Sequence, residues 1–369
     1  MLEYYITICS VLFTSYIAQT YQNTYKAKSN LKTKKQYAYG YIVFAFITAA
    51  ILIFVGGFRF RVGADYGNYT MAYYVRKDQW VEHLLTFDEP GLAVICKLAS
   101  MIYDDYATMF FICSLITIGM YLITITKYCD ETFIISILLF IFTGSWAGSF
   151  GAIRQYLAAA VIFIGHRLIL ERKFFKYALL ILAAMFFHRT AIIMLPVYFI
   201  ATRKINVRTI LILILVVVAI IYSYDSIFDV MSVLKDEDQA QYEYMQTQVN
   251  AFRVLVAFAP IGLYFITSRR RRPHNDKEVN FYSMLLFINA AFLLSTSNSA
   301  YLARVAIFTE AFPVIAFPKL LKYEPKATKN LYMAIILVCY FAYFSYQIYC
   351  SDALNNFRWI WERTSLFWW

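Results

Sequence analysis

Arginines near the ends of apolar segments are the side chains of this sequence best suited to chemistry. Arginine pairs with phosphate or carboxylate through a planar fork of N–H donors. Ionisable groups in membrane segments are costly and usually functional, although any single arginine could instead snorkel to lipid headgroups. If they converge, these arginines would form a cationic cavity for an anion such as a lipid-linked diphosphate. They are Arg59, Arg61, Arg154, Arg189, Arg253 and Arg304.

Apolar helices are the elements that must position these arginines. Hydrophobic residues make up 61% of the 369 residues, charged residues make up only 15%, and the mean hydropathy is +0.56. Soluble domains are about half apolar and a quarter charged, whereas apolar runs of roughly 17–25 residues are typical of membrane-spanning helices. We therefore predict an all-α, polytopic integral membrane helical bundle that forms a single transmembrane domain over residues 1–369.

The loops between these helices predict their sidedness. Short basic loops mark the cytoplasmic side of a membrane protein, which accounts for the net charge of +11 without a nucleic-acid partner. Two acidic segments, residues 58–106 and 223–250, then fall outside the cytoplasm. The bundle has about eleven to twelve spans, two of them being halves of a broken hairpin. The other predicted spans cover residues 4–20, 37–57, 107–126, 132–147, 152–170, 209–222, 251–268, 280–296, 301–317 and 331–349.

Two segments depart from simple spanning helices. Residues 177–202 have basic loops at both ends and a polar break at His188 and Arg189. Broken helices occur at membrane depth where protein or a wet cavity surrounds them, so we predict a helical hairpin with His188 at its outer tip. Within the first acidic segment, residues 89–101 are apolar but too short to span, and Pro90 suits the first turn of an interfacial helix.

Four motifs in this order resemble those of one family. They are Gly57-Phe-Arg-Phe-Arg-Val-Gly-Ala-Asp-Tyr-Gly-Asn-Tyr69, Ile153-Arg-Gln-Tyr-Leu-Ala158, Phe186-Phe-His-Arg-Thr190 and the pair Tyr301 and Arg304. Together with the helix count they resemble EpsG-type polysaccharide polymerases of the Wzy-like family, over nearly the whole chain. Arg189, which follows the histidine, is a departure from the family's pattern.

The resemblance implies a reaction and a place for it. Such enzymes are glycosyltransferases that join oligosaccharide repeat units carried on undecaprenyl diphosphate, in O-antigen, capsule or exopolysaccharide biosynthesis. They work at the outer face of the bacterial inner membrane, and their fold belongs to the GT-C-like class. The resemblance implies no cofactor and no metal, with the lipid-linked oligosaccharide, membrane lipids and a chain-length regulator protein as partners. The sequence agrees, because it has neither a phosphate-binding glycine loop nor metal-ligand spacing.

Residue roles follow from the resemblance as hypotheses. The proton of the attacking sugar hydroxyl requires a base, for which a histidine suits best because its pKa is near neutral. The candidate bases are His188, Asp65 and Glu89. The candidate diphosphate-binding arginines are Arg59, Arg61, Arg154, Arg253 and Arg304. The candidates for neutral or sugar contacts are Gln155, Tyr301, Tyr66 and Tyr69.

Two other functions remain open on the sequence. An O-antigen ligase-type transferase would use a similar donor but a different acceptor. A transporter or flippase for lipid-linked oligosaccharides would be expected to show repeated halves and charges on both sides or at mid-membrane. The sugar, its linkage and the stereochemical outcome are not encoded in any pattern that we can identify.

Overall fold

The computed structural model describes residues 1–27, 31–79, 83, 89–223, 247–271 and 274–363. The chain divides into two compact units, and the predicted single transmembrane domain stays a prediction. Unit 1 comprises Met1–His166, Phe175–Ile192 and Leu331–Trp369, and unit 2 comprises Arg167–Phe174 and Ile193–Asn330.

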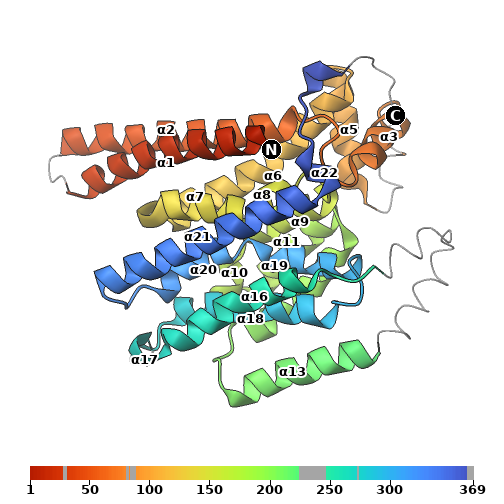
Figure 1. The fold of residues 1–369 in the computed structure, drawn as a ribbon. Coiled ribbons are helices and arrows are strands. Elements are labelled where there is room, and N and C mark those ends of the chain that lie inside the picture. Colours follow the sequence, from red (N-terminus) through yellow and green to blue (C-terminus); the bar gives the residue numbers. More distant parts are fainter. Residues whose placement is uncertain (28–30, 80–82, 84–88, 224–246, 272–273, 364–369) are drawn as a thin grey trace. The chain divides into compact units, whose positions relative to one another are not determined.

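Unit 1 is built around a long helical pair. Helices α1 (Leu2–Ala27) and α2 (Leu31–Gly57) run side by side along their length (Figure 1). Helix α2 also packs on α6, and α6 packs on α9. The remaining helices of this unit are α3 (Tyr66–Arg76), α5 (Pro90–Ile102), α6 (Tyr106–Tyr128), α7 (Phe133–Phe142), α8 (Ser145–Gly148), α9 (Ile153–Ile164), most of α11 (Phe174–Met185) and of α21 (Lys326–Cys350), and α22 (Asp352–Asn355).

Unit 2 is organised by α18 (Lys277–Ser295). This helix is buried on most sides and contacts α12 (Met194–Ala201), α13 (Val207–Tyr222) and α16 (Ala251–Ile266). It also packs against a series of short elements that follow it. The other elements of the unit are α10 (Arg167–Leu170), α17 (Ser268–Arg271), the 3-10 turn η4 (Leu302–Ala306), α19 (Ile307–Glu310) and α20 (Pro313–Leu320).

The prediction of an all-α polytopic membrane protein is confirmed. Within the described residues, four helices are long and apolar enough to cross a bilayer: Tyr37–Gly57, α6, α18 and α21. Other apolar helices have 10 to 17 residues. At 1.5 Å per residue, a helix of twelve residues is roughly 18 Å long and does not cross a hydrocarbon core of about 30 Å.

Three predicted spans are wrong as continuous helices. The predicted span 132–147 ends as a helix at Phe142, because Gly144 adopts a left-handed conformation with φ of 96°. The predicted span 152–170 breaks at Gly165, between α9 and α10. The predicted span 301–317 is η4, α19 and α20 in succession, and Pro313 lacks the N–H needed to continue the helix. Breaks of this kind are tolerated where protein surrounds them.

The predicted hairpin break is confirmed. Helix α11 ends at Met185, and a 3-10 turn (Arg189–Ile193) leads into α12. The ring centre of Phe174, at the start of α11, lies 5.2 Å from that of Tyr198, near the end of α12. The first and last residues of this segment therefore lie close together. This return of the chain leaves His188 at the turn.

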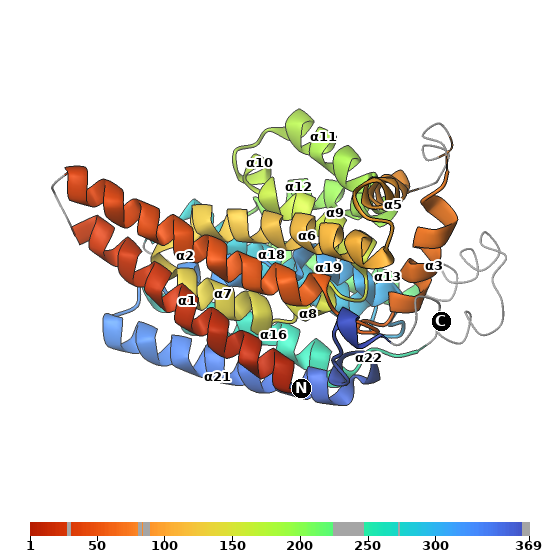
Figure 2. The same ribbon diagram turned by 90° about the horizontal axis from the view of Figure 1, so that it is seen from above.

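The described residues of the first acidic segment include two long helices where one was expected. Helix α5 corresponds to the predicted interfacial helix, with Pro90 in its first turn. Helix α3 was not expected, and it lies beside α5 at one end of unit 1 (Figure 2). Of the second acidic segment, residues 224–246 lie outside the described residues.

The C-terminal residues bind back to this same end of unit 1. We call residues 351–363 the C-terminal strap. Phe60 N–H donates to the carbonyl of Arg358 at 2.8 Å, and Ile360 N–H donates to that of Phe58 at 2.8 Å. Arg363 forms a two-pronged ion pair with Asp105, the N-cap of α6. The strap therefore joins the segment after α2 to the start of α6.

Candidate active site

Glu89 is the centre of a charged cluster in unit 1. It precedes Pro90 at the start of α5, and only 10% of its side chain is exposed. Its Oε2 accepts a hydrogen bond from Arg154 Nη1 at 2.6 Å. Arg154 is the second residue of α9, so this contact joins two helices that are 65 residues apart in sequence.

The tip of the hairpin contacts the other carboxylate oxygen of Glu89. His188 Nδ1 lies 2.7 Å from Glu89 Oε1, which is an ion-pair distance. The two atoms are not aligned for a hydrogen bond. The backbone N–H of Arg189 donates to the same Oε1 at 2.9 Å. The N–H of Gly91 donates to the carbonyl of Phe186 at 2.8 Å, which attaches the tip to the first turn of α5.

The surroundings of Glu89 keep it ionised. Burial on its own would raise the pKa of this carboxyl, but the approach of His188, the N–H of Arg189 and the charge of Arg154 together hold the pKa below its ordinary value. At neutral pH the carboxylate is therefore negative. A carboxylate at ion-pair distance can stabilise the positive charge of a protonated imidazole.

Helix α3 supports the cluster with an aromatic face. The hydroxyl of Tyr69 accepts a hydrogen bond from the backbone N–H of Arg154 at 3.4 Å. Tyr66, Tyr69 and Tyr73 are buried in the core that joins α3, α5, α6 and α9. Arg76 lies in the last turn of α3, and burial lowers the pKa of its guanidinium. The guanidinium also interacts electrostatically with Glu89 and Arg154. The predicted sugar contacts of Tyr66 and Tyr69 stay predictions.

Arg59 has a structural environment. Its side chain is 1% exposed and lies 4.8 Å from the ring centres of both Phe110 and Phe150. Its guanidinium donates to the carbonyls of Val62 and Phe150, each at 3.0 Å, and to that of Gly56. Arg59 thus closes the turn after α2 from within, while its predicted role in diphosphate binding stays a prediction.

Arg61 and Asp65 lie in the loop that follows. Arg61 is exposed and has a left-handed backbone with φ of 55°, a conformation that non-glycine residues rarely adopt. Such strain is concentrated at functional sites. Asp65 is half-buried at the N-cap of α3, and its charge reaches Tyr69. Asp65 therefore lies close to the face of α3 that supports Arg154, whereas Arg61 lies in the loop before the helix.

The remaining candidates divide between the units. Gln155 is buried in α9 beside Arg154. Arg253, Tyr301 and Arg304 belong to unit 2, where the guanidinium of Arg304 lies 5.9 Å from the ring centre of Tyr301. Backbone hydrogen bonds between residues 247–249 and 297–300 bring these three residues to one end of that unit. Their roles in substrate binding stay predictions.

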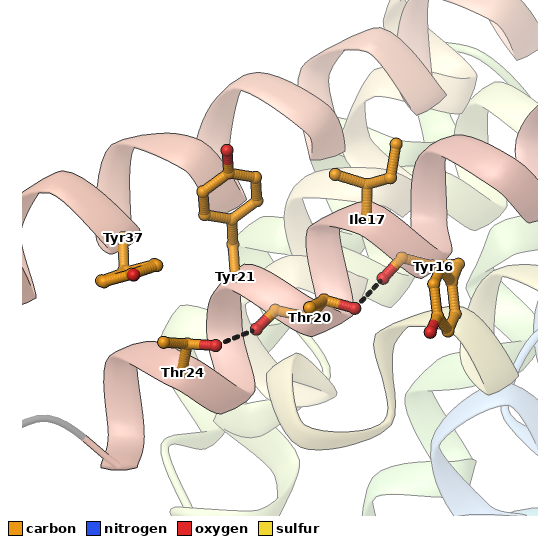
Figure 3. A pocket seen from close by; sticks show the side chains of 6 residues that line it. All are labelled: Tyr16, Ile17, Thr20, Tyr21, Thr24 and Tyr37. Atoms are coloured by element: carbon orange, nitrogen blue, oxygen red, sulfur yellow. Dashed lines mark hydrogen bonds between the residues drawn. The ribbon is translucent and has the colours of Figure 1, made fainter.

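A cavity of about 330 Å³ lies against α1 and α2 near their connection. Figure 3 shows Thr20 and Thr24 donating to helix carbonyls one turn earlier, so these hydroxyls serve their own helix. The six lining side chains carry no charge; they are Tyr16, Ile17, Thr20, Tyr21, Thr24 and Tyr37. This lining therefore provides no charged side chain to bind an anion.

Sequence reasoning missed Arg76 and the support from α3. The signal was present as spacing, because Tyr66, Tyr69, Tyr73 and Arg76 recur at i, i+3, i+7 and i+10, which places them on one face of a helix. The contacts of the C-terminal strap carried no comparable signal, since its residues meet partners some 250 to 300 positions away.

Comparison with known proteins agrees with the motifs. A model of the EpsG family matches residues 42–360, a range that contains α3, α5, α9, the hairpin tip and most of the strap. No curated protein and no solved structure matches the chain. The EpsG family is a Wzy-like family of polysaccharide polymerases. Two of the motifs supply Arg154 and His188 to the charged cluster, and the family model matches most of the length of the chain, so the chain belongs to the EpsG family.

Proposed function

We propose that this protein polymerises oligosaccharide repeat units carried on undecaprenyl diphosphate, at the outer face of the bacterial inner membrane. The observation that carries the proposal is the convergence of Arg154 and His188, which belong to two separate motifs, on Glu89. A histidine held by a carboxylate, next to arginines, combines a base with groups that bind a leaving anion.

The reaction is a glycosyl transfer. A hydroxyl of the acceptor sugar forms a bond to the anomeric carbon of the donor, and the bond from that carbon to the diphosphate oxygen breaks. His188 takes the hydroxyl proton on Nε2, because Nδ1 faces Glu89. Glu89 stabilises the resulting imidazolium without taking the proton itself, as a carboxylate does in other histidine dyads.

Arginines receive the leaving charge. The side chain of Arg154 is 37% exposed although Nη1 binds Glu89, and Arg189, whose backbone N–H also binds Glu89, is an exposed residue. Fixed cations placed where negative charge develops are worth more in a water-poor site than in bulk water. The diphosphate therefore binds on Arg154 and Arg189, which both meet Glu89, and no nucleotide sugar, cofactor or metal takes part.

Purified protein incubated with its lipid-linked repeat unit and a metal chelator tests the proposal. We expect a ladder of polymers from the wild-type protein. His188→Ala and Glu89→Gln should lower the rate by a factor of about 10²–10⁴, the usual contribution of a positioned base. His274→Ala and Glu171→Gln are matched controls at exposed positions, and they should leave the ladder unchanged.

The outcomes separate the roles. A ladder that forms only after a divalent metal is added contradicts metal-independent transfer. Full-length polymer from His188→Ala removes this histidine as the base, and Asp65→Asn then tests the other carboxyl candidate. Attachment of single repeat units to a different acceptor, without polymer, would instead identify a ligase.

A further inference from the structure

A cavity of about 380 Å³ in unit 1 borders the first half of α3, and Tyr69, which contacts the cluster around Glu89, is not among its lining residues. It is formed mainly by the loop after α2, the first half of α3 and the start of α6. Its lining is aromatic with a few polar groups: Phe60, Arg61, Tyr66, Gly67, Thr70 and Tyr106. Most small-molecule sites are concave and have this combination, in volumes of about 300–1,000 Å³.

Helix α3 presents two faces to two different places. Tyr66, Gly67 and Thr70 line the cavity. In contrast, Tyr69 hydrogen-bonds the backbone of Arg154, and Arg76 interacts electrostatically with Glu89. At 100° per residue Gly67 and Thr70 lie on a different face of the helix from Tyr69 and Arg76, and Tyr66 lies between the two faces. A ligand in the cavity would therefore lie one helix away from the proposed base and arginines, at the shared end of unit 1.

We infer that this cavity binds sugar residues of the acceptor repeat unit, an inference that rests on the proposed polymerase function. A pyranose ring has apolar C–H faces and a rim of hydroxyls. Aromatic side chains suit the faces, and Arg61 and the hydroxyl of Thr70 can hydrogen-bond the rim. The cavity is also large enough for more than one sugar ring.

The competing ligands fit this cavity less well. A diphosphate needs several cations, and Arg61 is the single charged residue among the lining residues, whereas Arg154 and Arg189 meet at Glu89. A lipid tail needs an apolar groove along a spanning segment. This cavity instead follows the end of the span at Gly57 and carries Arg61, whose backbone is held in a left-handed conformation.

Gly67 provides a way to fill the cavity without distorting the fold. A Cβ added at this position meets no atom within 4 Å, and Gly67 lies inside α3, where most other residues favour the helix more than glycine does. Gly67→Leu therefore places a side chain into the lining of the cavity. Gly119 of α6 has the same open space around its added Cβ, so Gly119→Leu is the matched control.

Binding to the full-length protein in lipid nanodiscs tests the inference with two probes. The first is the free oligosaccharide released by mild acid from the lipid-linked repeat unit, and the second is undecaprenyl diphosphate without sugar. We expect Gly67→Leu to weaken oligosaccharide binding about tenfold or more, a change of about 1.4 kcal/mol. Its Kd for undecaprenyl diphosphate should stay within about twofold of the wild-type value, and Gly119→Leu should bind both probes normally.

Each contrary result has its own meaning. If Gly67→Leu binds the oligosaccharide as tightly as the wild type, or the wild type binds only the diphosphate probe, the cavity is not an acceptor site and the polymerase proposal still stands. If Gly67→Leu loses the diphosphate probe, the cavity belongs to the donor. If the wild type binds neither probe, both the proposed function and this inference are wrong.

Discussion

Arg59 and Arg61 lie two residues apart in one motif, yet their environments are opposite. Arg59 is buried and donates to three backbone carbonyls, whereas Arg61 is exposed beside a cavity. A buried carbonyl that loses its donor costs about 1–3 kcal/mol, so the burial of Arg59 is favourable only while all its donors are used. The same residue type therefore supports the fold from within at one position and lines a cavity at the other.

Replacement of each arginine by methionine tests this difference. We expect Arg59→Met to destabilise the protein by about 3 kcal/mol or more, because three carbonyls lose their donors. Arg61→Met should leave the thermal unfolding midpoint in detergent unchanged and lower polymer formation. An unfolding midpoint for Arg59→Met equal to that of the wild type would contradict the structural role, and normal polymer from Arg61→Met would remove Arg61 from the site.

The identity of the site residues was predictable to a useful extent. Glu89, Arg154 and His188 were all candidates, because charged residues in or beside apolar segments are costly and therefore informative. Their pairing was not predictable, since the contacts join positions 65 to 100 residues apart. Sequence separation of this size leaves no local pattern.

At the scale of elements, the C-terminal strap is the feature that most affects the site. It binds the loop that carries Arg59 and Arg61 by backbone hydrogen bonds and holds the N-cap of α6 by an ion pair. The tryptophans in the strap, Trp359 and Trp361, stack at 4.8 Å and lie near Phe54.

Removal of the ion pair tests the strap. Arg363→Met leaves Asp105, whose side chain is 4% exposed, without its partner. Breaking a buried pair in this way costs about 3–5 kcal/mol, and the value should be near the lower end because Arg363 is 21% exposed. We expect a lower unfolding midpoint and weaker polymer formation. Lys173→Met, which breaks an exposed pair with Glu171, should change neither, and equal behaviour of the two variants would show that the strap is dispensable.

Helix existence was predictable from apolar runs, whereas helix continuity was not. The sequence placed elements correctly at α6, α13, α16 and α18, but it joined segments that the structure separates at Gly144, Gly165 and Pro313. Mean hydropathy measures how favourably a segment transfers into the bilayer. It does not change when one glycine adopts a left-handed conformation or when a proline lacks the N–H that a helix needs. Local backbone chemistry therefore decided where these helices end.

At the scale of the whole molecule, charge distribution predicts orientation. The N-terminal amine of Met1 donates to the carbonyl of Asn355 at 3.3 Å, so both terminal regions of unit 1 lie at one end of that unit. Arg61, Glu89 and His188 belong to the same end through their contacts with α3, α5 and the strap. The positive-inside pattern predicts that this end faces away from the cytoplasm.

Reporter fusions test the orientation. Alkaline phosphatase, which is active only outside the cytoplasm, should be active when it is fused after Ala64 or at the C-terminus. It should be inactive when it is fused after Arg208, in a basic loop. A fluorescent protein that folds only in the cytoplasm should give the reverse pattern. Phosphatase activity after Arg208 would invert the predicted topology and place the site on the cytoplasmic side.

The sequence by itself determined the membrane class, most helices and the identity of the key charged residues. These properties depend on composition and short-range periodicity, which a single chain displays directly. Only the tertiary structure decided which arginine is buried, that Glu89 joins Arg154 to His188, and that α3 separates this cluster from a cavity. The reason is that burial and pairing depend on contacts between segments that are far apart in sequence. These side chains contact their partners only after the segments have packed together.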